Sequence, residues 1–202
     1  MSSTSTETPD PPDARSRLVA AAVAAFAEKG FHGTTTRDIA STAGMSPAAL
    51  YVFFPSKEAL LHELSLVGHS RVLELVEESA SSAADPVDQL GAVVEAFVRD
   101  HAQSHTGARV INYELSALTA EHRAEITALR HRIDLVVRDV VQLGVDQGVF
   151  HTRDPHMTTL AVLSLGIDVA RWYRDEGVWS PADVAEHYRG LVLAMLGVAP
   201  DQ

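Results

Sequence analysis

Hydroxyl and basic side chains gather at two positions in residues 34–61 where helices are expected to begin. Thr35, Thr36 and Arg37 precede the apolar positions of one expected helix, and Lys57 stands at the start of another. The free N–H groups and the dipole of a helix N-terminus favour a phosphate or another anion. These four residues are therefore candidates for phosphate contacts.

Histidine offers a second kind of chemistry, because the chain has ten of them. Only His101 and His105 lie four apart on an expected helix, a spacing that can place two metal ligands on one face. No carboxylate or third histidine joins them at a suitable spacing, so we expect no metal site. We interpret seven of the other eight histidines as surface or interface residues: His62, His69, His122, His131, His151, His156 and His187.

Enzyme chemistry finds little support in the sequence. The chain has no cysteine, which excludes thiol nucleophiles, disulfides and Cys-ligated metals. It also lacks the GxSxG, GxxxxGK[ST] and HExxH motifs. Glu114, Asp134 and Asp168 are single acids on expected helices, where salt bridges and solvated faces are their usual roles. We expect neither an enzyme nor a cofactor.

The elements that must position these residues are predicted to be helices. No stretch alternates apolar and polar residues over the length of a strand, whereas apolar residues recur at steps of three and four. We predict an all-α fold of about nine helices. The first runs from Asp13 to Gly30, and later ones cover 109–118 and 119–148, with a chain break at 105–107. A further helix runs from 155 through 173 and is terminated at Gly177.

Residues 36–54 are typical of two short helices joined by a tight turn. We expect Thr36 to cap the first, and Gly44 to end it because glycine adopts the left-handed conformation without steric cost. Ser46 and Pro47 then suit the N-cap and first position of the second helix. Its apolar side is expected to hold Leu50, Phe53 and Phe54.

The order of these signals resembles the TetR family of transcriptional regulators across residues 15–62: Gly30-Phe31, then TTTRDIA, AGMS, LY and FPSKEAL. The resemblance implies DNA-backbone contacts by Tyr51 and by the four phosphate candidates above. It also implies that Ser46, Pro47, Ala48 and Ala49 face base edges. Phe53 stands where many members carry a histidine or another polar-tipped ring. We include its position in the DNA-binding set but expect the side chain to lie in the core.

Charge is distributed unevenly along the chain. The formal net charge is −11, yet residues 14–60 hold five Lys or Arg against three Asp or Glu. Residues 14–60 are therefore mildly basic, whereas the rest of the chain is acidic. Within the chain, residues 34–61 are the part best suited to bind DNA. We divide the chain into a disordered tail (1–13), a helix-turn-helix domain (14–60) and an effector-binding and dimerisation domain (61–202).

The C-terminal two-thirds is similar, more loosely, to the TetR subgroup that controls lipid, steroid or other CoA-linked catabolism. The matching stretches are VINYELSALTAEHRAEITALR, LGVDQGVF and ARWYRDEGVWSPADVAEHYRGLVLAML. This implies an acyl-CoA thioester held among the helices of residues 85–175, with its cations supplied by arginines such as Arg109, Arg123, Arg130, Arg132 and Arg138. The ligand-binding residues would be Phe97, His101, Asn112, Glu114, Leu115, Leu118 and Trp172. Each could instead be plain core packing.

The last two expected helices carry more apolar surface than one helical stripe needs, which predicts a homodimer with a four-helix seam. Its interface residues would be Leu163, Ile167, Val184, Tyr188, Leu191, Val192 and Met195. A larger monomeric core is the alternative interpretation.

Together these features predict a cytoplasmic, dimeric repressor that a small-molecule effector releases from a palindromic operator. No apolar run is long enough to cross a bilayer, and the polar, acidic N-terminus is unlike a signal peptide. Alternatives remain: a drug- or fatty-acid-responsive regulator, a small-molecule carrier without DNA function, or an all-α lipid-modifying enzyme that uses Glu114.

Overall fold

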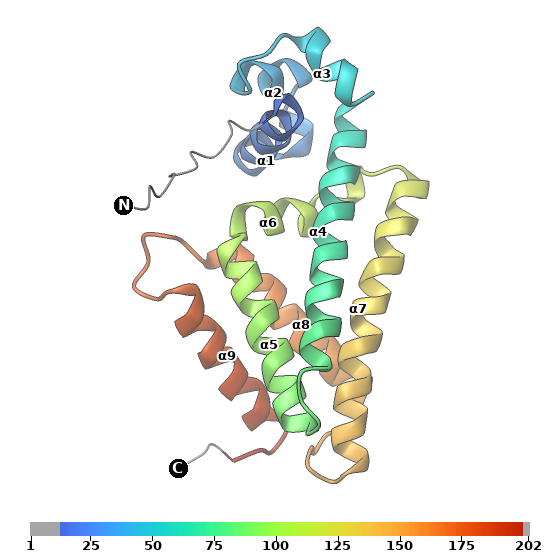
Figure 1. Ribbon diagram of the computed structural model, residues 1–202, viewed down its shortest axis with the longest axis vertical. Coiled ribbons are helices and arrows are strands. Elements are labelled where there is room, and N and C mark those ends of the chain that lie inside the picture. The colour runs from blue at the N-terminus through green and yellow to red at the C-terminus, as the bar shows by residue number, and fades with distance from the viewer. Residues whose placement is uncertain (1–12, 200–202) are drawn as a thin grey trace, which may run out of the picture.

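The computed structural model describes residues 13–199 of the chain (Figure 1). Within that range it has nine α-helices, one 3₁₀ turn and no strand, which confirms the predicted fold class. The helices are α1 (Ala14–Gly33), α2 (Thr36–Thr42), α3 (Pro47–Phe53), α4 (Lys57–Ala80), α5 (Pro86–Gln103), α6 (His105–Tyr113), α7 (Ala120–Asp146), α8 (Pro155–Trp172) and α9 (Pro181–Met195), with the 3₁₀ turn at Leu115–Ala117.

Helix starts follow the predicted capping chemistry. Four helices begin with a Ser or Asp side chain that accepts a hydrogen bond from a backbone N–H of the first turn, and proline follows directly. The caps are Ser46, Asp85, Asp154 and Ser180. Of the predicted tail, residues 1–13, only Asp13 is described, and it caps α1 through a 2.7 Å hydrogen bond from Ser16 N.

Helix ends are less regular than predicted, and a tertiary contact explains one of the differences. The helix expected over 109–118 ends at Tyr113, because Glu114 leaves helical geometry and its carboxylate accepts a 3.2 Å hydrogen bond from Phe31 N. The chain breaks at Ser104, before the expected 105–107. At Gly30 the backbone has φ = 70°, so α1 kinks at the predicted stop but continues to Gly33.

Two hydrophobic cores hold the helices together. One lies among α4, α5, α7, α8 and α9. The other joins α1, α2, α3 and the start of α4, and it also contains Val110 of α6, Leu118, and Ile126 of α7. The domain boundary at residue 60 stays a prediction, since α4 crosses it without a break and the second core draws on both sides.

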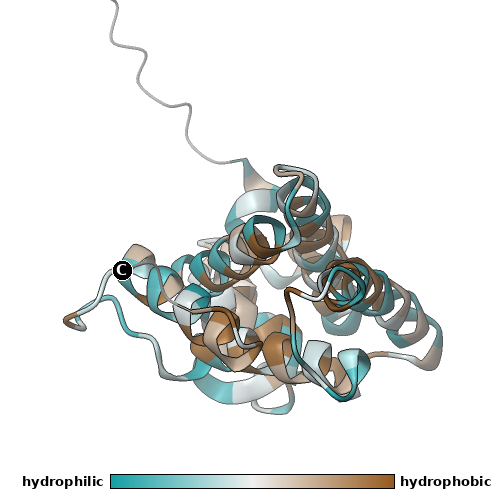
Figure 2. Cartoon of the chain, turned by 90° about the horizontal axis from the view of Figure 1, so that it is seen from below, coloured by the Kyte–Doolittle hydropathy of each residue, from teal (hydrophilic) through white to brown (hydrophobic). Residues whose placement is uncertain are grey.

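The helices form an elongated bundle with α1–α3 at one end (Figure 1). From there α4 descends into the body beside α7, while α5 lies between α4 and α9. The apolar faces of the helices turn toward one another (Figure 2). Short α6 lies across the junction, where Arg109 Nη2 donates to Ala27 O of α1 at 3.0 Å. Two polar contacts, from Arg109 and Glu114, thus tie α6 to α1.

Candidate functional site

The two short helices α2 and α3 meet through a tight turn in which Gly44 has φ = 68°. The N-cap of α2 is Thr35 and not Thr36, because Thr35 and Asp38 form a reciprocal capping box. Thr36 instead lies one position inside the helix, where its Oγ1 is 3.2 Å from the Tyr51 hydroxyl. That contact fixes the start of α2 against α3.

The outward face of α3 is small and uncharged. Ser46, Pro47 and Ala48 are exposed and Ala49 is half-buried, as predicted for a helix that approaches another surface closely. The prediction that Phe53 lies in the core is wrong: its side chain is 39% exposed, and the neighbouring Phe54 fills the core at 2%. Phe53 is the last residue of α3, whereas Phe54 is its C-cap with an extended backbone conformation.

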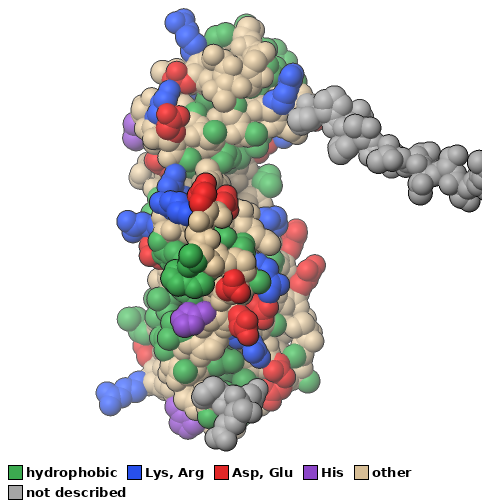
Figure 3. Space-filling model, turned by 90° about the vertical axis from the view of Figure 1, so that its left-hand side faces the viewer, with side chains coloured by type: hydrophobic (Ala, Val, Ile, Leu, Met, Phe, Trp, Pro, Cys, Tyr) green, Lys and Arg blue, Asp and Glu red, His purple; other side chains and the backbone are tan. Residues whose placement is uncertain are grey.

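Cations near this face have different surroundings. Arg37 is exposed and has no ion-pair partner within residues 13–199. Lys57 is turned inward: its Nζ donates to Phe31 O and to Thr34 O, both at 2.6 Å, and lies 4.2 Å from the centre of the Phe31 ring. Lys57 therefore holds the end of α1, which was not predicted. Charged side chains are only scattered over the face of this end that Figure 3 shows.

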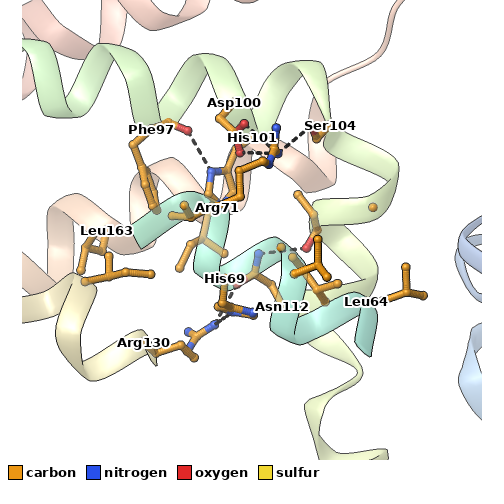
Figure 4. A pocket seen from close by; sticks show the side chains of 18 of the residues that line it. Leu64, His69, Arg71, Phe97, Asp100, His101, Ser104, Asn112, Arg130 and Leu163 are labelled. Carbon is orange, nitrogen blue, oxygen red and sulfur yellow. Dashed lines mark hydrogen bonds and ion pairs between the residues drawn. The ribbon is translucent and has the colours of Figure 1, made fainter. Parts of the chain in front are cut away.

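A cavity of about 720 Å³ opens beneath this unit, lined by residues of α1, α4, α5, α6, α7 and α8. Its apolar wall includes Val19 and Val23 of α1, Val67 of α4 and Ile111 of α6. Phe97, His101 and Asn112, predicted to contact a ligand, all line it (Figure 4). Helix α1, which packs against the helix-turn-helix α2–α3, thus forms part of the cavity wall.

One polar group in the cavity centres on Arg71 and Asp100 (Figure 4). An Arg71 nitrogen lies 2.7 Å from Asp100 Oδ1, and Nη2 donates to Ser104 Oγ at 3.1 Å. Burial raises the pKa of Asp100, and the Arg71 charge opposes that rise. Neighbouring His101 donates from Nδ1 to Phe97 O at 2.8 Å, and burial lowers its pKa to about 4, so its ring is neutral at pH 7.

A second polar group joins Arg130 of α7, Asn112 of α6 and His69 of α4 (Figure 4). Arg130 Nη1 donates to Asn112 Oδ1 at 2.8 Å and lies 3.4 Å from His69 Nε2. His69, predicted as a surface or interface residue, is 4% exposed. Burial lowers its pKa to about 4. The half-buried amide of Asn112 is thus paired through its oxygen with Arg130.

The other predicted ligand residues lie outside the cavity lining. Glu114 contacts α1 as described, Leu115 and Leu118 pack in the core around α1–α3, and Trp172 is 40% exposed at the end of α8. Of the two cavity arginines with polar partners described above, Arg130 was predicted only as one of several possible cations for CoA, and Arg71 was not predicted. In the sequence, both arginines lie on amphipathic helices beside apolar residues. Many other charged residues of these helices do so as well, so this pattern does not identify them as cavity residues.

The predicted dimer residues divide into three groups. Leu163 and Ile167 line the cavity. Val184 and Val192 are buried in the core of their own subunit, at 5% and 1% exposure, because α9 packs along α5. Tyr188 is half-buried, whereas Leu191 and Met195 are 42% and 49% exposed. Only the last two present a predominantly outward apolar surface.

Within residues 13–199 no group of three His, Asp or Glu side chains is arranged to hold a metal ion. His101 and His105 each direct Nδ1 to a backbone carbonyl instead. In the same range, no helix combines the length and the apolar character that a transmembrane helix requires.

Comparison with known proteins places both parts of the chain in one family. Residues 18–64 match the family model described as bacterial regulatory proteins, tetR family. Residues 83–196 match the model described as tetracyclin repressor-like, C-terminal domain.

Individual relatives cover nearly the whole chain. The HTH-type transcriptional repressor KstR2 of Mycobacterium tuberculosis is 30% identical over 187 residues, 89% of this chain and 90% of that protein. A regulatory protein in the tetR family from Rhodococcus RHA1 is 38% identical over 94% of this chain and 100% of its own, with a TM-score of 0.87. AibR, solved with isovaleryl coenzyme A and operator DNA, is 22% identical over 89% of this chain and 97% of its own, with a TM-score of 0.80.

Proposed function

The chain belongs to the TetR family of bacterial regulatory proteins, and from this premise we propose that it is a repressor released from its operator by an acyl-CoA thioester. Its relatives are dimeric transcriptional regulators that bind operator DNA and a small-molecule effector, and they are not enzymes. The proposal concerns the identity of the effector and the residues of this chain that contact DNA.

On the DNA side, the exposed face of α3 is proposed to enter the major groove. Ser46, Pro47, Ala48 and Ala49 would approach base edges, because no long side chain holds the helix away from them. Thr35, Arg37 and the Thr36–Tyr51 pair would contact the backbone. With two-fold symmetry, the recognition helices of a dimer would sit roughly 34–36 Å apart on a palindrome.

The observation that carries the effector proposal is the cavity wall. A volume of about 720 Å³ is in the range of small-molecule sites, and its lining is mostly apolar with a few convergent polar groups. Val19 and Val23 bring α1 into that wall, so a bound effector would contact the DNA-binding unit directly. An effector that prefers one position of α1 over another shifts the repressor between states.

We favour a CoA thioester over a free hydrophobic compound as the effector because of two proteins to which this chain is similar. The chain resembles KstR2, whose structure is described as a ketosteroid transcriptional regulator. AibR, which shares the fold, binds isovaleryl coenzyme A and operator DNA. An acyl group would fill the cavity, and the rest of the cofactor would extend through its exposed rim.

The test is operator release. The purified protein is bound to labelled DNA from upstream of its own gene, and acyl-CoAs of increasing chain length are titrated against the corresponding free acids by fluorescence anisotropy. We expect saturable release by acyl-CoAs. Release by free acids alone would defeat the thioester proposal, and absence of any specific DNA binding would defeat the assignment of α3. Ala48→Glu is the matched variant: it should abolish DNA binding and leave effector binding unchanged.

The dimer seam is proposed to use the outward faces of α8 and α9. Leu191→Asp would place a charge on the exposed apolar surface, and we expect sedimentation to show a monomer that still folds. Val178→Asp, at an 86% exposed position in the α8–α9 connection, is the control that should remain dimeric. If both variants sediment like the parent protein, this seam is misplaced.

A further inference from the structure

Three arginines line the cavity, and only two of them have a carboxylate partner. Arg15 forms an ion pair with Glu63, and Arg71 with Asp100. Arg130 forms no ion pair with any Asp or Glu of residues 13–199. It is therefore the one cavity arginine of the described chain whose charge is not balanced by direct contact.

The contacts of Arg130 are with neutral groups. Asn112 Oδ1 accepts from Nη1 at 2.8 Å, and Asn112 is itself oriented by a 2.9 Å hydrogen bond from Nδ2 to Ala108 O. His69 donates from Nδ1 to Ser65 O at 2.8 Å, which leaves Nε2 as an acceptor toward the guanidinium. Both contacts involve Nη1, so Nη2 has no protein acceptor among residues 13–199.

The guanidinium of Arg130 is partly desolvated by its position in the cavity wall. Burial lowers the pKa of Arg130, but arginine stays protonated in proteins. A partly desolvated cation with unused donors is stabilised by an anion, and a carboxylate matches its planar fork with two parallel hydrogen bonds. Asn112 and His69 hold one side of the fork in place, which reduces the entropy lost when a ligand binds.

We propose that Arg130 binds a carboxylate carried by the effector. This rests on the proposed function only in that the effector occupies this cavity. A carboxylate can come from two sources: a free hydrophobic acid, or an acyl-CoA whose acyl group bears a second carboxyl group. The carboxyl of an ordinary acyl-CoA is masked in the thioester, so such a molecule offers Arg130 no anion inside the cavity.

Asp134 provides an opposing charge effect. It lies one turn after Arg130 on α7, is 8% exposed and lines the same cavity, and its Oδ1 has no hydrogen-bond partner within residues 13–199. A carboxylate bound nearby would be repelled by Asp134. Removing the charge of Asp134 should thus act in the opposite direction to removing that of Arg130.

The experiment compares three probes by titration calorimetry with the full-length protein: dodecanoate, dodecanoyl-CoA, and the CoA monothioester of dodecanedioic acid. We expect Arg130→Gln to weaken the two carboxylate-bearing probes by about 10- to 100-fold and dodecanoyl-CoA by less than about 3-fold. Asp134→Asn should strengthen the carboxylate-bearing probes. Arg130→Lys, which keeps the charge, should recover part of the lost affinity.

Arg132→Gln is the matched control, because it removes the same charge from the same helix at a side chain that is 59% exposed and pairs with Glu77. Operator binding without any probe shows that each variant is folded. The proposal is overturned if Arg130→Gln and Arg132→Gln bind the carboxylate-bearing probes equally, or if neither of these probes binds the parent protein.

The two proposals fail separately. If dodecanoyl-CoA releases DNA and Arg130→Gln changes no affinity, the CoA proposal stands and the carboxylate proposal is overturned. If only dodecanoate binds, with a strong dependence on Arg130, the carboxylate proposal is supported and the CoA thioester is excluded.

Discussion

Replacing Glu114 with alanine separates two roles that this residue could have. Its Oε1 accepts a 3.2 Å hydrogen bond from Phe31 N, directly after the kink at Gly30, and it lies outside the cavity lining. A hydrogen bond to a charged group contributes about 1.5–3 kcal/mol. We therefore expect Glu114→Ala to lower the free energy of unfolding by that amount, and the melting temperature by roughly 3–10 °C.

Effector affinity should stay within about 2-fold of the parent protein, because no ligand contact is lost. Thermal unfolding with and without effector measures both quantities on one sample. Glu28→Ala is the control, since Glu28 is an exposed acid of α1 without a hydrogen-bond or ion-pair partner in residues 13–199, and it should change stability by less than about 0.5 kcal/mol. Equal stability of the two variants, or a large loss of effector affinity in Glu114→Ala, would refute the placement of this side chain.

Because Lys57 donates to backbone carbonyls of Phe31 and Thr34, Lys57→Met should destabilise the end of α1 and weaken operator binding. The salt dependence of operator binding, measured as the slope of log affinity against log salt concentration, should not change. A slope smaller by about one unit would instead identify Lys57 as a phosphate contact. Gly68→Ala would place a methyl group 2.4 Å from Ile111 Cδ1, the end of a flexible side chain, so Ile111 must leave its present rotamer at a cost of about 0.5–1.5 kcal/mol. Ile111→Val, which removes that terminal methyl, should restore part of the stability in chemical denaturation. Burial lowers the pKa values of His69 and His101 from 6.5 to about 4 on folding. Their contribution to stability is therefore complete above pH 6.5 and is lost as the pH falls toward 4. Urea unfolding should show a lower free energy of unfolding at pH 5.0 than at pH 7.5, and a His69→Gln, His101→Gln double variant should show a smaller difference between the two pH values.

Local signals predicted the elements of the fold well, because each depends on neighbours in the chain. The cap at Ser46, the proline after it and the glycine turn at Gly44 are all read from adjacent residues. Glu114 shows where this fails. Its helix ends early because of a partner 83 positions away, which no local pattern records.

The cavity was only partly predictable for the same reason. Phe97, His101 and Asn112 were placed near a ligand by the family resemblance. Arg130 and His69 reach the cavity from α7 and α4, and their contact with each other depends on how these two helices pack. Lys57 illustrates the converse, since a cation at a helix N-terminus suits a phosphate equally well until the neighbouring carbonyls of α1 are placed.

The second core limits how this regulator can be recombined with its relatives. Val110, Leu118 and Ile126 complete the packing around α1–α3, so residues 14–60 do not close their own interior. A chimera that exchanges only residues 14–60 must fit the side chains at four buried positions outside that range, those of Leu61, Val110, Leu118 and Ile126, or leave a void. A domain exchange that preserves folding should therefore transfer α6 and the first turns of α7 together with the DNA-binding helices. The segment that must be exchanged to transfer operator specificity is thus larger than the helix-turn-helix itself.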